Sequence, residues 1–292
     1  MKLQAAVLGL VVVALASTAS ADPLTDRRPR AASVSVCTDQ FLLTLAEPDQ
    51  IAAVSWQAAR PRSPVRHLAT GYPSIRGSAE ELLAVETDLV IFDPYGHPDT
   101  SLRLEELGTE VVRLGPITSV ADVETELRHL ADALGVSQRG ADLAEALAAR
   151  RLELAQQADR LQNRPRALYV VPGGGGAGAD TFIDEVIRLG GFENLQAELG
   201  FAGWGRIPLE RLIENPPDVI IMTFFDTSDP SLLDGFGRHP RFRELIETTP
   251  IITVPAAPWL CAGPYLLDAA EYLAAERERM FPGGAVVRGD GS

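Results

Sequence analysis

Two cysteines, four histidines and three tryptophans are the residues of this 292-residue chain whose types are best suited to chemistry or ligand binding. The four histidines include no close pair at metal-ligand spacing, and His129 and His239 stand among polar residues typical of a surface. Ser, His and Asp nowhere form a nucleophile elbow of the G-x-S-x-G kind. The sequence therefore predicts neither a bare zinc or manganese site nor a covalent catalyst.

The glycine-rich stretch "VVPGGGGAGAD" could approach a ligand through its backbone. Gly173, Gly175 and Gly178 match G-x-G-x-x-G, the pattern of a dinucleotide site, but one match inside a run of glycines is weak evidence. We expect instead that Gly174 and Gly175 lie in a ligand crevice at the carboxyl end of a strand. A loop without ligand contacts is the alternative.

Short apolar runs alternate with helical patterns on either side of a long helical stretch. Strands are expected at 31–36, 51–55, 88–92, 110–115, 166–171, 218–224 and 251–254. Residues 139–162 contain no Pro or β-branched residue, which favours a helix of about 30 Å that forms one domain's face or bridges two domains. The pattern predicts an α/β fold in which two lobes, each with a mostly parallel sheet flanked by helices, are joined by one long α-helix. The expected parts are an N-terminal lobe at 32–138, the connecting helix at 139–163 and a C-terminal lobe at 165–281.

Several side chains of the first lobe follow predicted strands, where α/β proteins form ligand crevices. The residues expected at this edge are Cys37, Thr38, Tyr72, Arg76, Tyr95 and His97. Tyr or His could ligate the iron of haem, and His could ligate cobalt, but hydrogen bonding is the commoner role of such residues. We therefore expect ligand contacts here and assign no metal ligand.

The first residues form a pattern typical of an export signal. Lys2 precedes the apolar run 5–16, and Ala19-Ser20-Ala21 resembles a cleavage site, so residues 1–21 are expected to be removed on export to the periplasm. No cysteine follows that could carry a lipid anchor. The formal charge of −14 becomes −15 when Lys2 is lost, and such a surface repels nucleic acid and anionic lipids.

One helix–strand unit occurs twice, as "AEELLAVETDLVIF" at 79–92 and "LERLIENPPDVIIM" at 209–222. Glu80 aligns with Glu210, and Asp88 aligns with Asp218. Acidic residues are common in the first turn of a helix, where they complement the helix dipole. That explains either glutamate alone, but it does not explain why both lobes carry one.

The segments "SAEELLAVETDLVIF", "GWGRIPLERLIENPPDVIIM" and "SVSVCTDQFLLTLAEPDQIAAVS" resemble the substrate-binding proteins of ABC importers for ferric siderophores and cobalamin. The resemblance covers essentially the whole mature chain, although Thr87 stands where a proline commonly precedes the Asp. It implies a monomer that captures an iron chelate (siderophore or haem) or cobalamin in a cleft between the lobes. It further implies delivery to an ABC permease dimer with its ATPase, modest lobe closure, no resident cofactor and no enzymatic activity.

The same resemblance implies roles for residues in both lobes. Glu80 and Glu210 would dock against arginines of the two permease subunits. Trp204 and Trp259 would lie on cleft loops, with core packing as their alternative. Arg206 would pair with an anionic ligand or remain a solvated surface residue.

The two cysteines follow strands of opposite lobes. Cys37 and Cys261 could be free buried thiols, thiols that face the ligand, or an inter-lobe disulfide, and we expect one of the first two. The competing function is an exported α/β enzyme that uses the glycine loop as an anion site. A two-lobed sensor is a third possibility.

Overall fold

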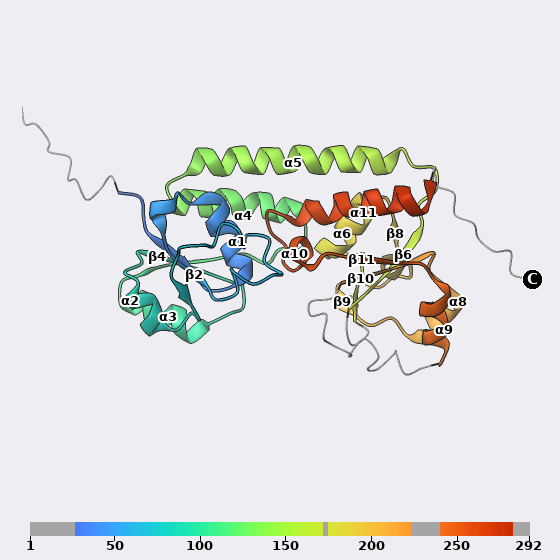
Figure 1. The fold of residues 1–292 in the computed structure, drawn as a ribbon, viewed down its shortest axis with the longest axis horizontal. Helices are drawn as coiled ribbons and strands as arrows, with labels where there is room; N and C mark the ends of the chain where they lie inside the picture. The colour runs from blue at the N-terminus through green and yellow to red at the C-terminus, as the bar shows by residue number, and fades with distance from the viewer. Residues whose placement is uncertain (1–26, 172–174, 224–239, 283–292) are drawn as a thin grey trace, which may run out of the picture.

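The computed structural model describes residues 27–171, 175–223 and 240–282. Two separate parallel sheets divide the protein into two lobes (Figure 1). The sheet of lobe one has the strand order β3-β2-β1-β4-β5. Its strands are β1 (Ala31–Ser33), β2 (Ile51–Ser55), β3 (Ser74–Ile75), β4 (Leu89–Phe92) and β5 (Glu110–Arg113). Around them lie α1 (Val36–Leu45), the 3-10 turn η1 (Pro48–Gln50), α2 (Ala79–Ala84) and α3 (Pro98–Glu106).

Lobe two repeats this plan with a sheet in the order β11-β10-β6-β8 and a separate antiparallel ribbon of β7 with β9. The strands are β6 (Arg166–Val170), β7 (Gly176–Ala177), β8 (Glu193–Asn194), β9 (Trp204–Gly205), β10 (Val219–Thr223) and β11 (Ile251–Val254). The helices are α6 (Phe182–Leu189), α7 (Leu195–Glu198), α8 (Leu209–Glu214), α9 (Pro240–Thr248), α10 (Ala256–Trp259) and α11 (Leu266–Met280).

A layer of long helices covers both sheets on one side. α5 (Ser137–Asp159) has 23 residues, about 35 Å, and spans both lobes, with α4 (Val120–Ala133) and α11 beneath it (Figure 1). A Cβ at Gly140 would meet Ala131 of α4, so this glycine permits the close approach of α4 and α5. The long helix therefore both bridges the lobes and forms part of their common core.

Continuous apolar strands are buried because helices pack on both faces of each sheet. In β10, Val219 and Ile221 join the core under α6 and α11, whereas Ile220 and Met222 face α8 and α9. The core that lies under the long helices is one connected cluster that runs through both lobes.

The repeated helix–strand unit forms α2–β4 in lobe one and α8–β10 in lobe two. Its aspartates have the same structural role, because Asp88 accepts a hydrogen bond from the backbone N–H of Arg30 at 2.8 Å and Asp218 accepts one from that of Arg166 at 2.7 Å. Each bond ties the start of β4 or β10 to the start of its neighbour, β1 or β6. These aspartates are therefore used inside the fold.

The predicted α/β fold class is confirmed, with small differences at element ends. The first strand is shorter than expected because Ser35 caps α1, and α5 begins two residues before the predicted helix. The predicted lobe limits stay predictions, and the export signal and His239 lie outside the described residues. Within the described ranges, no helix is both long and apolar enough to cross a membrane.

Candidate ligand-binding cleft

A disulfide bond joins the two lobes at the carboxyl ends of their sheets. Cys37 follows β1 in lobe one, Cys261 follows β11 in lobe two, and their Cα atoms are 5.5 Å apart. This separation is ordinary for a disulfide. The expectation of free or ligand-facing thiols is therefore wrong. The bond also places the two carboxyl edges, where α/β proteins bind ligands, face to face.

One face of α1 continues this junction. Cys37, Gln40 and Thr44 are spaced three and four residues apart and so share a side of the helix. Their lobe-two neighbours are Cys261, Gly263 and Tyr265, and we call these six residues the α1 seam. The Thr44 and Tyr265 hydroxyls are 3.2 Å apart, and a Cβ at Gly263 would meet Oε1 of Gln40 at 2.6 Å. The lobes thus touch closely along one side of the cleft.

Thr38 was expected to contact the ligand, and the structure contradicts this. Its side chain is fully buried, and its hydroxyl accepts hydrogen bonds from the backbone N–H groups of Val34 and Ser35 at 3.2 and 3.1 Å. Ser35 in turn accepts from the Thr38 N–H, which completes a capping box. The polar atoms of Thr38 are therefore used to start α1.

Asp39 lies in the first turn of α1 and is fully buried. It accepts hydrogen bonds from both the hydroxyl and the backbone N–H of Ser55, at 2.5 and 2.8 Å, and from the hydroxyl of Ser33. Burial raises the pKa of this carboxyl to about 6, against the opposing effect of the serine hydrogen bonds. This network joins the carboxyl ends of β1 and β2.

Tyr95 and His97 lie in the loop after β4, as expected. Tyr95 is 84% exposed, and His97 is exposed with a left-handed backbone (φ 54°) at the start of α3. The guanidinium of Arg113 donates to the carbonyl oxygens of Asp93 and Gly96 at 2.6 and 2.8 Å. Arg113 thus fixes the conformation of the loop from which Tyr95 extends into the solvent.

Trp56 is a further aromatic residue at the carboxyl end of a strand, and the sequence patterns did not single it out. It directly follows β2, is 37% exposed, and lies 5.0 Å from the guanidinium carbon of Arg60 and 5.5 Å from that of Arg76. Tyr95 was expected at the cleft because it follows the carboxyl end of a strand, and Trp56 meets the same criterion. Arg76 was expected here and is exposed, whereas Tyr72 is partly buried against the core.

Lobe two presents Trp204 from the β7–β9 ribbon. Trp204 is 58% exposed, and its ring centroid lies 5.6 Å from that of Phe182. Arg206 follows it and is exposed. Gly175 forms a bridge with Val171, while Gly174 lies outside the described residues. The glycine stretch leads into β7 rather than directly into a helix, which does not fit a dinucleotide site.

Trp259 was expected at the cleft and instead belongs to the core. It is 1% exposed, and its indole N–H donates to the hydroxyl of Tyr169 at 3.0 Å. Burial raises the pKa of Tyr169. The hydrogen bond satisfies the polar atom of the indole, so the ring can be buried against lobe two without an unpaired donor.

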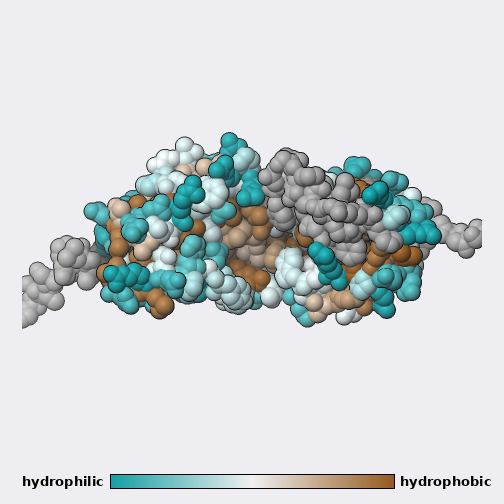
Figure 2. All heavy atoms as spheres, turned by 90° about the horizontal axis from the view of Figure 1, so that it is seen from below, coloured by the Kyte–Doolittle hydropathy of each residue, from teal (hydrophilic) through white to brown (hydrophobic). Residues whose placement is uncertain are grey.

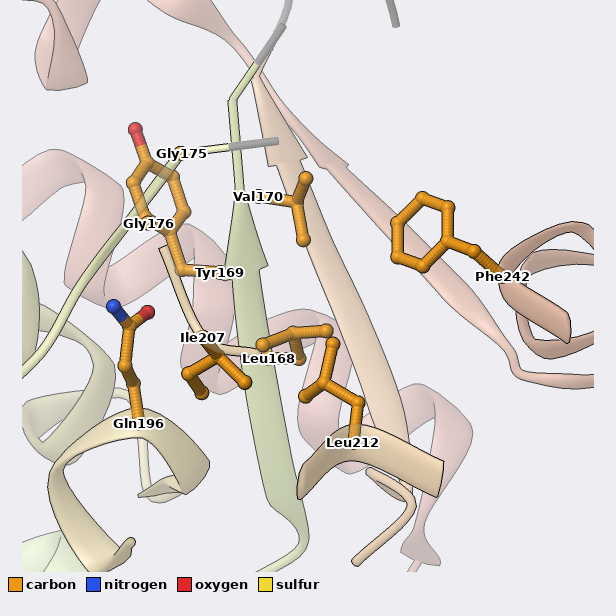
Figure 3. A pocket seen from close by; sticks show the side chains of 9 residues that line it. All are labelled: Leu168, Tyr169, Val170, Gly175, Gly176, Gln196, Ile207, Leu212 and Phe242. Atoms are coloured by element: carbon orange, nitrogen blue, oxygen red, sulfur yellow. The ribbon is translucent and has the colours of Figure 1, made fainter. Parts of the chain in front are cut away.

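The space between the lobes is hollowed and lined with apolar residues in the view from below (Figure 2). A different, narrower cavity lies inside lobe two (Figure 3). Its volume is about 10 Å³, room for about one water molecule, and its lining includes Leu168, Ile207, Leu212 and Phe242. Ligand sites usually measure about 300–1,000 Å³, so the inner cavity is too small for a macrocycle or a metal chelate.

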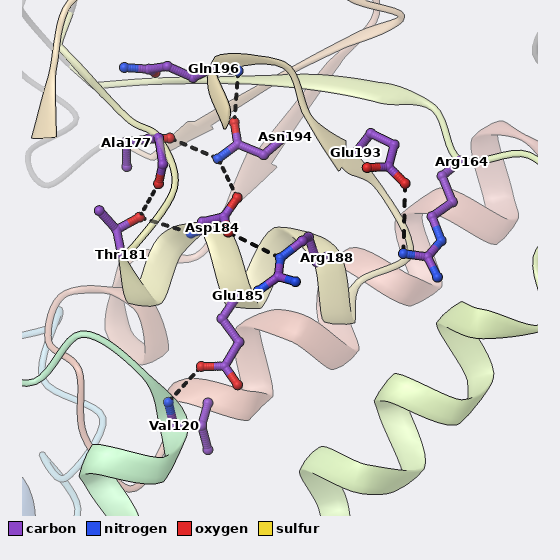
Figure 4. Close-up of polar contacts among 11 residues, drawn as sticks. Val120, Arg164, Ala177, Thr181, Asp184, Glu185, Arg188, Glu193, Asn194 and Gln196 are labelled. Atoms are coloured by element: carbon purple, nitrogen blue, oxygen red, sulfur yellow. Dashed lines mark hydrogen bonds and ion pairs between the residues drawn. The ribbon is translucent and has the colours of Figure 1, made fainter. Parts of the chain in front are cut away.

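Polar residues around α6 connect lobe two to the helical layer (Figure 4). Glu185 accepts a hydrogen bond from the backbone N–H of Val120, at the start of α4, at 2.7 Å. Asp184 accepts from Asn194 at 2.9 Å and from Arg188 at 3.1 Å. Because these groups satisfy one another, the cluster is a structural junction.

Residues 32–248 match the family model described as periplasmic binding protein. The chain belongs to the periplasmic binding protein family. No curated protein sequence gives a significant match to this member of the family.

Solved structures share the fold of this periplasmic binding protein. The haem-binding protein HutB of Vibrio cholerae is 20% identical, with a TM-score of 0.69, and the match covers 87% of this chain and 99% of that one. The haem-binding protein RhuT from Roseiflexus sp. RS-1 is 23% identical, with a TM-score of 0.63 and coverage of 85% and 99%. The vitamin B12-binding protein BtuF of Vibrio cholerae is 17% identical, with a TM-score of 0.63 and coverage of 85% and 96%. Identities this low establish the fold alone.

The two repeated glutamates of this periplasmic binding protein are exposed on α2 and α8. Neither Glu80 nor Glu210 forms a hydrogen bond or ion pair within the described part of the chain. Three residues further on, Leu83 is 44% exposed and Ile213 is 50% exposed. Each lobe thus presents the same pair of side chains, one acidic and one apolar. Both helices lie at the outer corners of the lobes, on the side opposite α5 (Figure 1).

Among the described residues, no three His, Cys, Asp or Glu side chains gather so that they could hold a metal ion. The candidate ligand surface therefore consists of aromatic and guanidinium groups rather than a set of metal ligands. The side chains of this candidate ligand surface, all exposed, are Trp56, Arg60, Arg76, Tyr95, Trp204 and Arg206.

Proposed function

We propose that this protein captures an iron chelate (siderophore or haem) or cobalamin in the periplasm and delivers it to an ABC permease. The observation that carries the proposal is the opposition of two sheet edges, linked by Cys37–Cys261, that expose aromatic and guanidinium side chains. Large flat side chains bury the surface of a macrocycle or chelate, and arginine binds its anionic groups. Membership of the periplasmic binding protein family and the haem and vitamin B12 proteins of the same fold support this assignment.

Visible absorption titration tests ligand capture, because haem, ferric siderophores and cobalamin have distinct spectra. We expect saturable binding of one of these ligands at one site per chain. A spectrum of the protein purified from its own host would identify the ligand carried in the cell. Failure of all three classes to bind, or turnover of phosphate or acyl esters, would contradict the proposal and favour an exported enzyme.

For delivery, Glu80 and Glu210 are the proposed contacts with the permease. Both carboxylates are free to pair with arginines of a partner, and one contact per lobe would orient the protein over two equivalent permease subunits. The exposed Leu83 and Ile213 supply apolar surface beside each charge. The recurrence of both features at matched positions favours a partner whose surface is itself repeated.

The double variant Glu80→Ala with Glu210→Ala tests docking. Removing one member of a hydrogen-bonded charge pair at an interface costs about 2 kcal/mol or more, or about 30-fold in affinity per contact. We expect impaired uptake and weak binding to the permease with unchanged ligand affinity. The control is Glu145→Ala, which removes an exposed carboxylate from α5. Normal uptake by the double variant would show that the docking assignment is wrong.

A further inference from the structure

Two unneutralised arginines share one tryptophan at the edge of lobe one. The guanidinium carbons of Arg60 and Arg76 lie 5.0 and 5.5 Å from the ring centroid of Trp56. Neither guanidinium forms an ion pair within the described residues, although the chain carries a formal charge of −14. We call Trp56, Arg60 and Arg76 the arginine–tryptophan platform.

Backbone hydrogen bonds fix the positions from which these three side chains extend. The Trp56 N–H donates to the carbonyl of Ile75 at 2.8 Å, which joins the ends of β2 and β3. The Arg76 N–H donates to Glu81 at 3.0 Å, in the capping box of α2. The Arg60 N–H donates to the carbonyl of Gln57 at 3.0 Å. The platform is thus built on ordered backbone rather than on a free loop.

The same segment reaches the junction between the lobes. The Gln57 side chain accepts a hydrogen bond of 3.4 Å from the backbone N–H of Val36, the residue before Cys37. The segment that carries Trp56 and Arg60 is therefore tied to the start of α1, the helix that carries the inter-lobe disulfide.

A purely structural role explains only part of this arrangement. One arginine is enough to cover the exposed face of an indole, whereas two guanidinium groups near one ring repel each other. A carboxylate bound to either guanidinium would neutralise its charge and accept paired hydrogen bonds from its planar fork. The indole would meanwhile supply a flat apolar surface for the body of the ligand.

We propose that the arginine–tryptophan platform binds carboxylates of the transported ligand and selects anionic, carboxylate-bearing chelates over neutral ones. The inference rests on the proposed function, and it names the ligand class. An iron porphyrin with two propionates belongs to this class, as does a ferric chelate of citrate. A neutral ferric trihydroxamate and cyanocobalamin do not.

The test uses the full mature protein with four probes: haem, ferric citrate, a neutral ferric trihydroxamate and cyanocobalamin. We expect one carboxylate-bearing probe to bind most tightly, and Arg60→Gln and Arg76→Gln each to weaken it about tenfold. Arg128→Gln on α4 makes the same charge change away from the platform and should leave affinity unchanged. If haem is the tightest probe, haem dimethyl ester should reproduce the loss, and circular dichroism should show all variants folded.

The outcomes separate the two proposals. Tightest binding of a neutral probe, or unchanged affinity in both platform variants, would overturn the carboxylate inference while leaving chelate capture intact. Binding of none of the four probes would instead contradict chelate capture, and the inference would fall with it.

Discussion

Removing the Cys37–Cys261 disulfide should strongly destabilise the protein. The two cysteines are 224 residues apart in sequence, so the bond closes a loop that spans most of the chain. For a loop of that length the chain-entropy relation gives about 5 kcal/mol, and measured effects are commonly smaller. We therefore expect Cys37→Ser with Cys261→Ser to lower the free energy of unfolding by about 2 to 5 kcal/mol. Since whole domains are stable by only about 5–15 kcal/mol, the change should be easy to measure.

Guanidinium unfolding followed by circular dichroism measures this change. The oxidised wild-type protein should unfold at a higher denaturant concentration than the double serine variant. Reductant supplies the matched control, because it should shift the wild type towards the variant and leave the variant unaffected. Equal midpoints for the oxidised wild type and the variant would refute the reasoning. So would alkylation and intact-mass analysis that finds two free thiols in the native protein.

Two further predictions concern buried positions. Burial raises the pKa of Asp39 from 3.8 to about 6, so its contribution to stability is present below about pH 4 and is lost as the pH rises through 6, by about 3 kcal/mol. The difference in free energy of unfolding between wild type and Asp39→Asn, measured from pH 4 to 7, should decrease as the pH rises. A difference that stays constant over this range would contradict the reasoning. A Cβ at Gly178 would meet the backbone carbonyl of Phe201, so Gly178→Ala should destabilise by about 1–3 kcal/mol. Gly205→Ala, where the added Cβ meets nothing within 4 Å, is the control, and equal melting temperatures for the two variants would count against the close-packing argument.

The fold was predictable because its signals are local. Buried strands such as 89–92 and 219–222 are continuous apolar runs, and the long helix lacks Pro and β-branched residues. The carboxyl-end rule also placed Tyr95 in an exposed loop at the expected edge. These patterns can be recognised within a few consecutive residues of the sequence.

The misplaced residues depend instead on contacts between distant segments. Trp259 is buried because Tyr169, 90 residues earlier, accepts its indole N–H. Cys37 is paired because β1 and β11, at opposite ends of the chain, end at the same junction. Thr38 is a different case, because its role in the capping box is local: its partner Ser35 is three residues away, but Thr stands where Glu or Gln is usual.

The repeated unit shows how structure separates residues that sequence comparison treats alike. Asp88 and Asp218 recur, and each accepts a backbone N–H that fixes two neighbouring strands, so their repetition follows from the fold. Glu80 and Glu210 recur with the same regularity, but neither has a partner within the described residues. The duplicated fold explains why the aspartates recur, because they fix the strands, but it does not explain why the glutamates recur. A contact outside the chain would account for a residue that is repeated without an internal contact, and for this reason we propose docking for the glutamates rather than for the aspartates.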